Sequence, residues 1–153
     1  MILDRAVDLP LADAEATARL GAAVAVALRR GDAVLLSGDL GAGKSTLARG
    51  LVRALTSPGE DVPSPTFTLV QTYDGPAFPV AHFDLYRLTS AEETDELGLE
   101  EAIEEGAAVV EWPQRLGARL PPDRLGIDLR MVGEGRLARI TPHGSWHGRT
   151  LDV

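Results

Sequence analysis

The sequence predicts an α/β fold in which a mostly parallel central sheet is flanked by helices, with antiparallel additions and a C-terminal hairpin. Two short apolar runs, residues 33–37 and 107–111, are typical of buried parallel strands. The first run leads into a glycine-rich turn at residues 38–43, which is followed by a segment of helical periodicity. The length predicts one domain spanning residues 1–153. Strand, glycine turn and helix in this order predict a ligand site at the carboxyl ends of the strands.

Each element has its own signal. A helix over residues 11–30 is predicted by apolar residues at four-residue spacing and a closing Gly31. The strand at 33–37 and a helix at 46–55 come next, and the dense turn residues of 57–65 predict a loop. Later elements are two strands at 67–73 and 78–86 joined by a turn, an acidic helix at 90–105 whose start has capping-box spacing, a strand at 107–111, a short helix at 112–119, and the hairpin strands 124–132 and 136–141.

Composition excludes several classes of protein. The chain has no cysteine, so a disulfide framework is impossible, and no apolar stretch is long enough to span a bilayer. Its start lacks the basic and then apolar pattern of a secretory signal, so we expect a soluble cytoplasmic protein. A formal net charge of −8 should repel phosphate backbones, so a partner would have to hold any nucleic acid.

The glycine-rich turn is part of a complete phosphate-binding loop, G-x-x-x-x-G-K-S, over residues 38–45. Its Lys44 is the only lysine among 15 Lys and Arg residues. A compact ammonium on a flexible stem can reach between β- and γ-phosphates, whereas a guanidinium donates in a wider, fixed fork. The loop and its context indicate a P-loop NTPase-like domain.

We expect the nucleotide to be bound by Asp39, Leu40, Gly41, Ala42, Gly43, Lys44, Ser45 and Thr46. Lys44 should bridge phosphate oxygens, and the Ser45 hydroxyl should ligate Mg²⁺. Thr46 could contact the α-phosphate or simply cap the helix. The chain contains no asparagine, so the guanine-specifying N-K-x-D motif is absent and ATP is favoured over GTP.

Two strand-borne carboxylates are candidates for the chemistry opposite Ser45. Asp84 shares one face of its strand with His82 and Tyr86, and Glu111 ends the most apolar strand. We assign Asp84 to Mg²⁺ and Glu111, which reaches further, to the orientation or activation of water. The opposite assignment, in which Glu111 is the metal ligand, remains open.

Three further residues have weaker signals. Thr66 lies in a proline-flanked loop where many nucleotide hydrolases sense Mg²⁺ and the γ-phosphate, although spacing alone favours a structural turn. For Trp112 we favour a core or interface position over base stacking. For Arg87 we favour an ion pair with the acidic helix over a role in phosphoryl transfer.

Four segments taken together resemble one family: SGDLGAGKST at 37–46, SPTF at 64–67, HFDLYR at 82–87 and EWP at 111–113. The family is TsaE, formerly YjeE, the bacterial ATPase component of the tRNA threonylcarbamoyladenosine machinery. The resemblance covers residues 11 to about 119 and implies that Thr66 lies in a switch-like loop, Asp84 in a Mg²⁺-associated strand and Glu111 in a catalytic Glu-Trp pair. Ser45 stands where the family commonly has Thr, and Gln114 where it often has an acidic residue.

The resemblance also implies ATP and Mg²⁺ as cofactors, and TsaB and TsaD as partners. That assembly, with TsaC supplying threonylcarbamoyl-adenylate, modifies the adenosine next to the anticodon of ANN-decoding tRNAs. ATP hydrolysis by this chain, weak without partners, would reset the assembly of TsaB and TsaD. The chain would contact tRNA only indirectly, through the complex. The alternatives are a small-molecule P-loop kinase, for which no arginine-rich lid is visible, and a non-catalytic ATP-gated adaptor.

Overall fold

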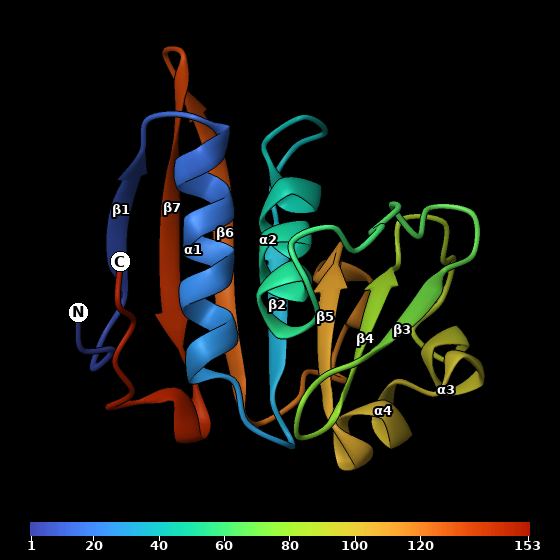
Figure 1. The fold of residues 1–153 in the computed structure, drawn as a ribbon. Coiled ribbons are helices and arrows are strands. Elements are labelled where there is room, and N and C mark those ends of the chain that lie inside the picture. Colours follow the sequence, from blue (N-terminus) through green and yellow to red (C-terminus); the bar gives the residue numbers. More distant parts are fainter.

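A computed structural model describes residues 1–153 and consists of one seven-stranded sheet with helices on both faces (Figure 1). The strands are β1 (Val7–Leu11), β2 (Ala33–Ser37), β3 (Val70–Asp74), β4 (Pro79–Asp84), β5 (Ala107–Glu111), β6 (Arg124–Val132) and β7 (Gly135–Pro142). The helices are α1 (Ala14–Ala27), α2 (Lys44–Leu55), α3 (Glu93–Leu97), α4 (Leu99–Glu105) and the short 3₁₀ helices η1 (Pro113–Leu116) and η2 (Gly144–Trp146). None of the helices is long and apolar enough to cross a membrane.

The sheet order is β1-β7-β6-β2-β5-β4-β3. The central pairs β6–β2, β2–β5 and β5–β4 are parallel, whereas β1–β7, β7–β6 and β4–β3 are antiparallel. The predicted parallel centre with antiparallel additions and a C-terminal hairpin is therefore confirmed. Because β2, β4 and β5 run in the same direction, their carboxyl ends meet at one edge of the sheet, where side chains from three segments can converge.

Two apolar layers hold the helices on the sheet. The larger cluster lies under α1 and α2, on the face that points toward the viewer in Figure 1, and contains Leu20, Val34 and Leu47. The smaller cluster lies on the other face and joins α4 and η1 to Phe83 and Val110. β2, β4 and β5 are covered on both sides, which explains why they lack the polar alternation of a half-exposed strand.

Several elements differ from the prediction, most by one to three residues at an end, such as β4 at 79–84 (expected 78–86) and η1 at 113–116 (expected 112–119). Residues 7–11 form an edge strand that the sequence analysis did not assign. Val7, Leu9 and Leu11 alternate with the exposed Asp8 and Pro10, and an edge position tolerates proline. The helix expected from residue 11 begins at Ala14, after Asp13 caps it by accepting the Ala16 N–H at 2.8 Å. The strand expected at 67–73 begins only at Val70, because the preceding turn holds Leu69 at φ 70°.

The acidic segment is two helices rather than one. Gly98 has φ 77° and ψ 31°, a left-handed conformation that ends α3 and redirects the chain into α4. The expected capping box at Ser90 is also shifted, since the Glu93 carboxylate accepts the Thr89 N–H at 3.2 Å. Thr89 hydrogen bonds lower the pKa of the Glu93 carboxyl below its usual range because they favour its charged form.

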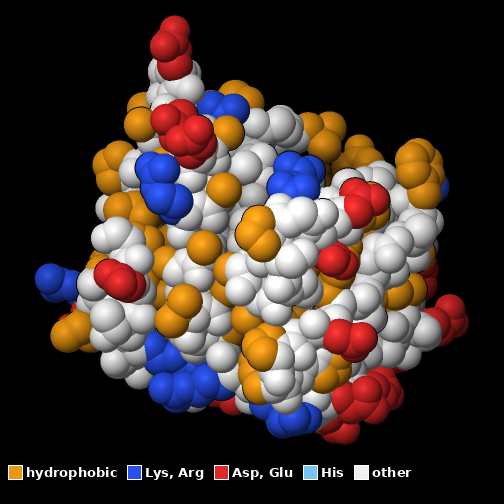
Figure 2. Space-filling model, in the orientation of Figure 1, with side chains coloured by type: hydrophobic (Ala, Val, Ile, Leu, Met, Phe, Trp, Pro, Cys, Tyr) orange, Lys and Arg blue, Asp and Glu red, His pale blue; other side chains and the backbone are white.

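The negative charge is concentrated in this segment. Residues 92–105 contain eight of the 23 Asp and Glu and no Lys or Arg, which leaves 15 acidic and 15 basic residues elsewhere. In Figure 2 the acidic side chains gather at the lower right, where Figure 1 shows α3 and α4. The rest of the chain therefore has no net formal charge.

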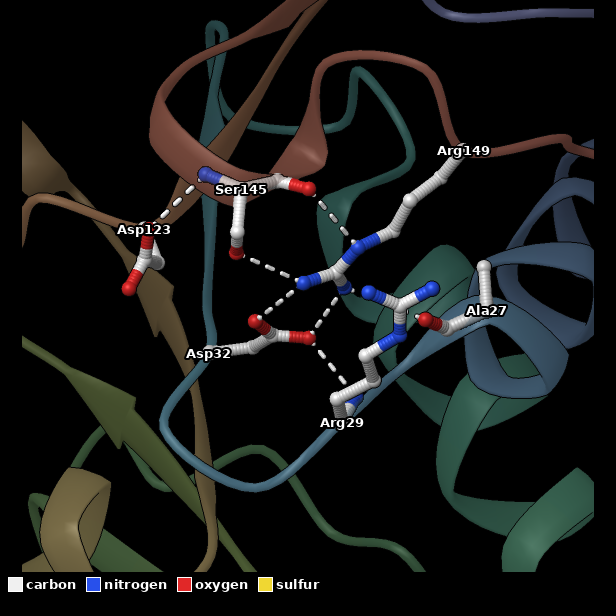
Figure 3. Close-up of polar contacts among 6 residues, drawn as sticks. All are labelled: Ala27, Arg29, Asp32, Asp123, Ser145 and Arg149. Atoms are coloured by element: carbon white, nitrogen blue, oxygen red, sulfur yellow. Dashed lines mark hydrogen bonds and ion pairs between the residues drawn. The ribbon is translucent and has the colours of Figure 1, made fainter.

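The C-terminal segment is fastened to the start of β2 by a buried ion pair (Figure 3). The Arg149 guanidinium donates to both oxygens of Asp32, to Ala27 O at 3.1 Å and to the Ser145 hydroxyl at 2.8 Å. Asp32 also accepts the backbone N–H of Arg29 at 2.6 Å. Every strong donor and acceptor in this cluster has a partner, as a buried pair of charges requires.

Candidate functional site

The loop at residues 38–43 leaves β2 and ends where α2 begins at Lys44. Its three glycines have positive φ angles of 138°, 82° and 110°, conformations that side chains with a Cβ rarely adopt. No side chain caps α2, so its first N–H groups are free to bind an anion at the positive end of the helix dipole. Thr46 therefore does not cap the helix; it lines a cavity of about 140 Å³ beside Thr17 and Arg136.

Lys44 lies above this loop and is only 6% exposed. Its ammonium donates to the Gly38 carbonyl and, at 3.0 Å, to the Asp39 carbonyl. Burial lowers its pKa, and the nearby carboxylates of Glu111 and Asp84 partly oppose that shift. The two loop carbonyls are thus the protein acceptors of this buried ammonium.

The other loop residues expected at the nucleotide differ in exposure. Leu40 is 72% exposed at the tip of the loop, whereas Ala42 is buried against the domain. Ser45 is partly exposed, and no protein group hydrogen-bonds its hydroxyl, so the oxygen is available to a ligand.

Asp84 and Glu111 lie side by side because the parallel register pairs them directly at the ends of β4 and β5. Both are almost fully buried, at 4% and 3% exposure. Glu111 is also the register partner of Leu36, one residue before the end of β2. The two carboxylates predicted from separate strands therefore meet next to the loop that carries Lys44.

Each oxygen of Asp84 has a protein donor. Oδ1 accepts the backbone N–H of Tyr86 at 2.9 Å, and Oδ2 accepts the Thr66 hydroxyl at 3.2 Å. Ser64 and Thr66 share a hydroxyl–hydroxyl hydrogen bond of 2.8 Å. Thr66 is thus not only a turn residue: it connects the proline-flanked loop to one of the two buried carboxylates.

Glu111 has one donor, which the sequence analysis missed. The Nε2 atom of His82 lies 2.7 Å from Glu111 Oε2, and both side chains are buried. No protein donor contacts Glu111 Oε1. Strand alternation places His82 on the same face as Asp84, but only the register of β4 with β5 brings it to Glu111.

Trp112 follows Glu111 in a left-handed conformation with φ 60°. Its ring is 4.5 Å from the Lys44 ammonium and 4.9 Å from the Tyr86 ring, and its apolar edge packs against the smaller core cluster. The core position favoured from the sequence therefore describes only the part of Trp112 that packs against this cluster. A cation over a tryptophan face is attracted by the ring quadrupole, so Trp112 also helps to hold Lys44 in place.

Arg87 does not pair with the acidic helices as expected. Its guanidinium stacks on the exposed ring of Phe67 at 4.6 Å, next to Thr66. Arg119 makes the contacts with α3 instead, at 3.4 Å to Asp95 and 3.9 Å to Glu92. The loop at 64–67 is thereby fastened to the end of β4 twice, once through Thr66 and once through Phe67.

Arg136 is a second residue that the sequence analysis missed. From β7 it donates to the carbonyls of Gly41 at 3.1 Å and Ala42 at 3.2 Å, so the C-terminal hairpin braces the phosphate-binding loop. The residue is 94 positions away from the loop in the chain. No local pattern could connect the two, because the contact depends on the β7–β6–β2 order of the sheet.

The residues predicted for Mg²⁺ offer only oxygen atoms, the ligands that Mg²⁺ prefers. The structure contains no group of three or more His, Cys, Asp or Glu side chains suited to hold a metal by themselves. Ser45 and Asp84 would therefore share the ion with phosphate oxygens and water, as is usual for Mg²⁺ bound with a nucleotide.

Fold and site together define a P-loop α/β protein with two buried carboxylates beside the loop. The family model described as "Threonylcarbamoyl adenosine biosynthesis protein TsaE" matches residues 11–139. The chain belongs to the TsaE family.

Relatives with the name "tRNA threonylcarbamoyladenosine biosynthesis protein TsaE" are similar over most of their length. The Nostoc protein is 41% identical over 93% of this chain and 90% of its own, and the Rickettsia felis protein is 38% identical over 90% and 81%. The crystal structure of Bacillus subtilis YdiB is similar with a TM-score of 0.76 and 29% identity, covering 92% of this chain and 88% of that one. The similarity therefore includes the β6–β7 hairpin that carries Arg136.

Proposed function

We propose that this chain is the Mg²⁺-dependent ATPase of the cytoplasmic machinery that forms threonylcarbamoyladenosine next to the anticodon of ANN-decoding tRNAs. In this proposal ATP hydrolysis resets an assembly with TsaB and TsaD. Membership of the TsaE family supports the pathway. The observation that carries the enzymatic part is the convergence of Lys44, Asp84 and Glu111 at one edge of the sheet.

ATP would be held by the free N–H groups at the start of α2 and by Lys44. On binding, the ammonium would exchange its two loop carbonyls for β- and γ-phosphate oxygens. Bound Mg²⁺ would neutralise the charge that develops on the phosphates. The Ser45 hydroxyl oxygen would be a ligand of the ion, and Asp84 would hold its water shell, since each carboxylate oxygen can accept a second hydrogen bond beside those from Thr66 and Tyr86.

Hydrolysis needs a water in line with the γ-phosphorus. The free Oε1 of Glu111 would accept a proton from this water as its oxygen bonds to phosphorus. The bond between the γ-phosphorus and the bridging oxygen then breaks, and the products are ADP and inorganic phosphate. Trp112 and Lys44 limit the solvent around this space, where electrostatic interactions are stronger than in bulk water.

The charge distribution supports an indirect relation to tRNA. The acidic segment at residues 92–105 repels phosphate backbones, and the rest of the chain has as many acidic as basic residues, so it has no large excess of positive charge with which to attract them. We therefore expect TsaB and TsaD to hold the tRNA while this chain contributes the nucleotide cycle.

Reconstitution with TsaB, TsaD and threonylcarbamoyl-adenylate tests the proposal. Wild-type protein should release phosphate in a Mg²⁺-dependent manner and support repeated rounds of tRNA modification. Lys44→Ala should support at most one round. Undiminished multiple-turnover modification by Lys44→Ala would show that ATP is not used in this way.

A matched variant separates an ATPase from an ATP-gated adaptor. Glu111→Gln keeps the size of the side chain and should bind ATP without cleaving it. If Glu111→Gln supports full repeated modification, ATP binding alone drives the cycle and the adaptor is correct. If wild-type protein instead transfers the γ-phosphate to a metabolite faster than to water, the kinase alternative is correct.

A further inference from the structure

The contact between His82 and Glu111 is unusual because it is a polar pair inside an otherwise apolar sheet. His82 is 1% exposed and Glu111 is 3% exposed. The register places His82 beside Val109, so the imidazole must reach diagonally, one pair of residues along the strands, to meet Glu111 at 2.7 Å. A water-filled site would not need this contact, since solvent could satisfy either group.

The hydrogen on this imidazole can be placed by counting partners. The Nδ1 atom of His82 is buried and has no hydrogen-bond partner. A buried N–H without an acceptor is rarer in proteins than an unused lone pair. The ring is therefore best described with its proton on Nε2, which donates to the Glu111 carboxylate, and with an unused lone pair on Nδ1.

This hydrogen bond distinguishes the oxygen atoms of the two carboxylates. Both oxygens of Asp84 accept from protein donors, as does Oε2 of Glu111. Only Oε1 of Glu111 has no protein donor. Because a carboxylate is rigid and planar, fixing Oε2 also fixes the direction of Oε1.

We propose that His82 is the positioning residue for Glu111: it holds Oε2 so that Oε1 is the oxygen presented to the attacking water. His82 contacts neither nucleotide nor water in this role and acts only through Glu111. The inference rests on the proposed ATPase function. It adds a residue from the middle of β4 to a site otherwise built from strand ends and loops.

Two amide variants test the proposal. The side-chain nitrogen of His82→Gln lies near the position of Nε2 and can still donate to Glu111, whereas His82→Asn carries the same amide one methylene too short. In single-turnover hydrolysis of radiolabelled ATP with TsaB and TsaD, His82→Asn should be slower by about 10- to 100-fold, the usual effect of losing an outer-shell partner. His82→Gln should be within about threefold of wild type.

ATP affinity and thermal melting distinguish positioning from a purely structural role. Both variants should bind a fluorescent ATP analogue with wild-type affinity. A structural role would lower the melting temperature and the folded fraction of His82→Asn but leave the rate per folded molecule unchanged. A folded His82→Asn with a wild-type rate, or a folded His82→Gln that is as slow as His82→Asn, overturns the proposal.

The native protein gives an independent measurement that needs no variant to fold. Long-range ¹H–¹⁵N spectra should show His82 with its proton on Nε2; a proton on Nδ1 alone would overturn the proposal.

In the single-turnover hydrolysis assay, Glu111→Gln tests the proposed ATPase function itself. If Glu111→Gln hydrolyses ATP like wild type, the proposed role of Glu111 is wrong, whatever the His82 variants do. If Glu111→Gln is inactive but both His82 variants hydrolyse ATP like wild type, the role of Glu111 stands and only the positioning role of His82 is wrong.

Discussion

Lys44 shows why one lysine can be kept in a chain that otherwise uses arginine. Its ammonium fits between two loop carbonyls and the face of Trp112, a space bounded on three sides. An ammonium makes these contacts from a single nitrogen atom, whereas a guanidinium is wider and spreads its donors over a fixed planar fork, so it would have to displace the loop carbonyls or the ring. The site therefore selects the shape of the cation as well as its charge.

Lys44→Arg should consequently slow ATP hydrolysis by on the order of 100-fold, the size of effect seen when one donor to a transition state is misplaced. Phosphate release by the variant together with TsaB and TsaD measures this. Arg139 is exposed on β7, so Arg139→Lys is the matched control and should keep the wild-type rate. Normal hydrolysis by Lys44→Arg would mean that charge alone matters at this position.

Asp84→Asn addresses the assignment of the two carboxylates. The amide keeps the size of the side chain but loses the charge that would hold the Mg²⁺ water shell. We expect the Mg²⁺ concentration needed for half-maximal ATP binding to rise on the order of tenfold, with metal-free binding little changed. Titration of Mg²⁺ against a fluorescent ATP analogue gives this value, and the opposite assignment is correct if Glu111→Gln shifts the midpoint and Asp84→Asn does not.

The site residues that the sequence predicts are those that belong to a recognisable local pattern. The loop, Asp84 and Glu111 follow from strand–loop–helix order and strand ends, and the structure brings them together. His82 and Arg136 were missed because their roles depend on neighbours far away in the chain. Such contacts are set by register and strand order, which no periodicity in one segment encodes.

At the scale of elements, the long acidic helix was the largest error. Helical periodicity and acidic composition continue through residues 90–105, so the pattern predicted one helix. Gly98 interrupts it, because glycine is the usual residue at a left-handed helix end. The break lets Leu99 pack on the second face of the sheet, which a straight helix would not allow.

Gly98→Ala should therefore destabilise the fold by about 1–2 kcal/mol, the cost of forcing a Cβ into the left-handed region. Crowding contributes little, because the nearest atom to an added Cβ would be a Glu101 carboxylate oxygen at 3.6 Å. Urea denaturation measures the change in free energy of unfolding. Gly59→Ala is the control: its φ is not in the left-handed region and it has open space around it, so a comparable loss in both variants would contradict the explanation.

The C-terminal hairpin contributes to the site through Arg136. The two hydrogen bonds from Arg136 to the loop can be removed without unfolding the hairpin. Arg136→Met keeps the length and apolar stem of the side chain but loses both charged hydrogen bonds to the loop. We expect ATP affinity to fall on the order of tenfold with little change in melting temperature. Arg139 lies on the same strand and pairs with the half-exposed Asp8, so Arg139→Met should bind ATP like wild type.

At the scale of the molecule, both chain ends lie together at the β1 side of the sheet (Figure 1). Ile2 and Thr150 form an isolated β-bridge, and Trp146 is fully buried. The family model ends at residue 139, so this C-terminal closure extends beyond the matched segment. The buried Asp32–Arg149 pair belongs to this closure and lies at the end of β2 opposite the phosphate-binding loop.

Arg149→Met should destabilise the protein by about 3–5 kcal/mol, because it leaves the buried Asp32 charge without its counter-charge. Arg139→Met is the matched control: its ion pair with Asp8 is about half exposed and should be worth at most about 1 kcal/mol. Urea denaturation followed by circular dichroism is the suitable measurement, since Arg149 stacks on Trp146 at 4.2 Å and its loss would alter tryptophan fluorescence directly. ATP affinity of the folded Arg149→Met protein should stay at the wild-type value, because the pair lies at the far end of β2. Equal losses of stability in the two variants would mean that the C-terminal segment is held by its apolar contacts and not by the ion pair.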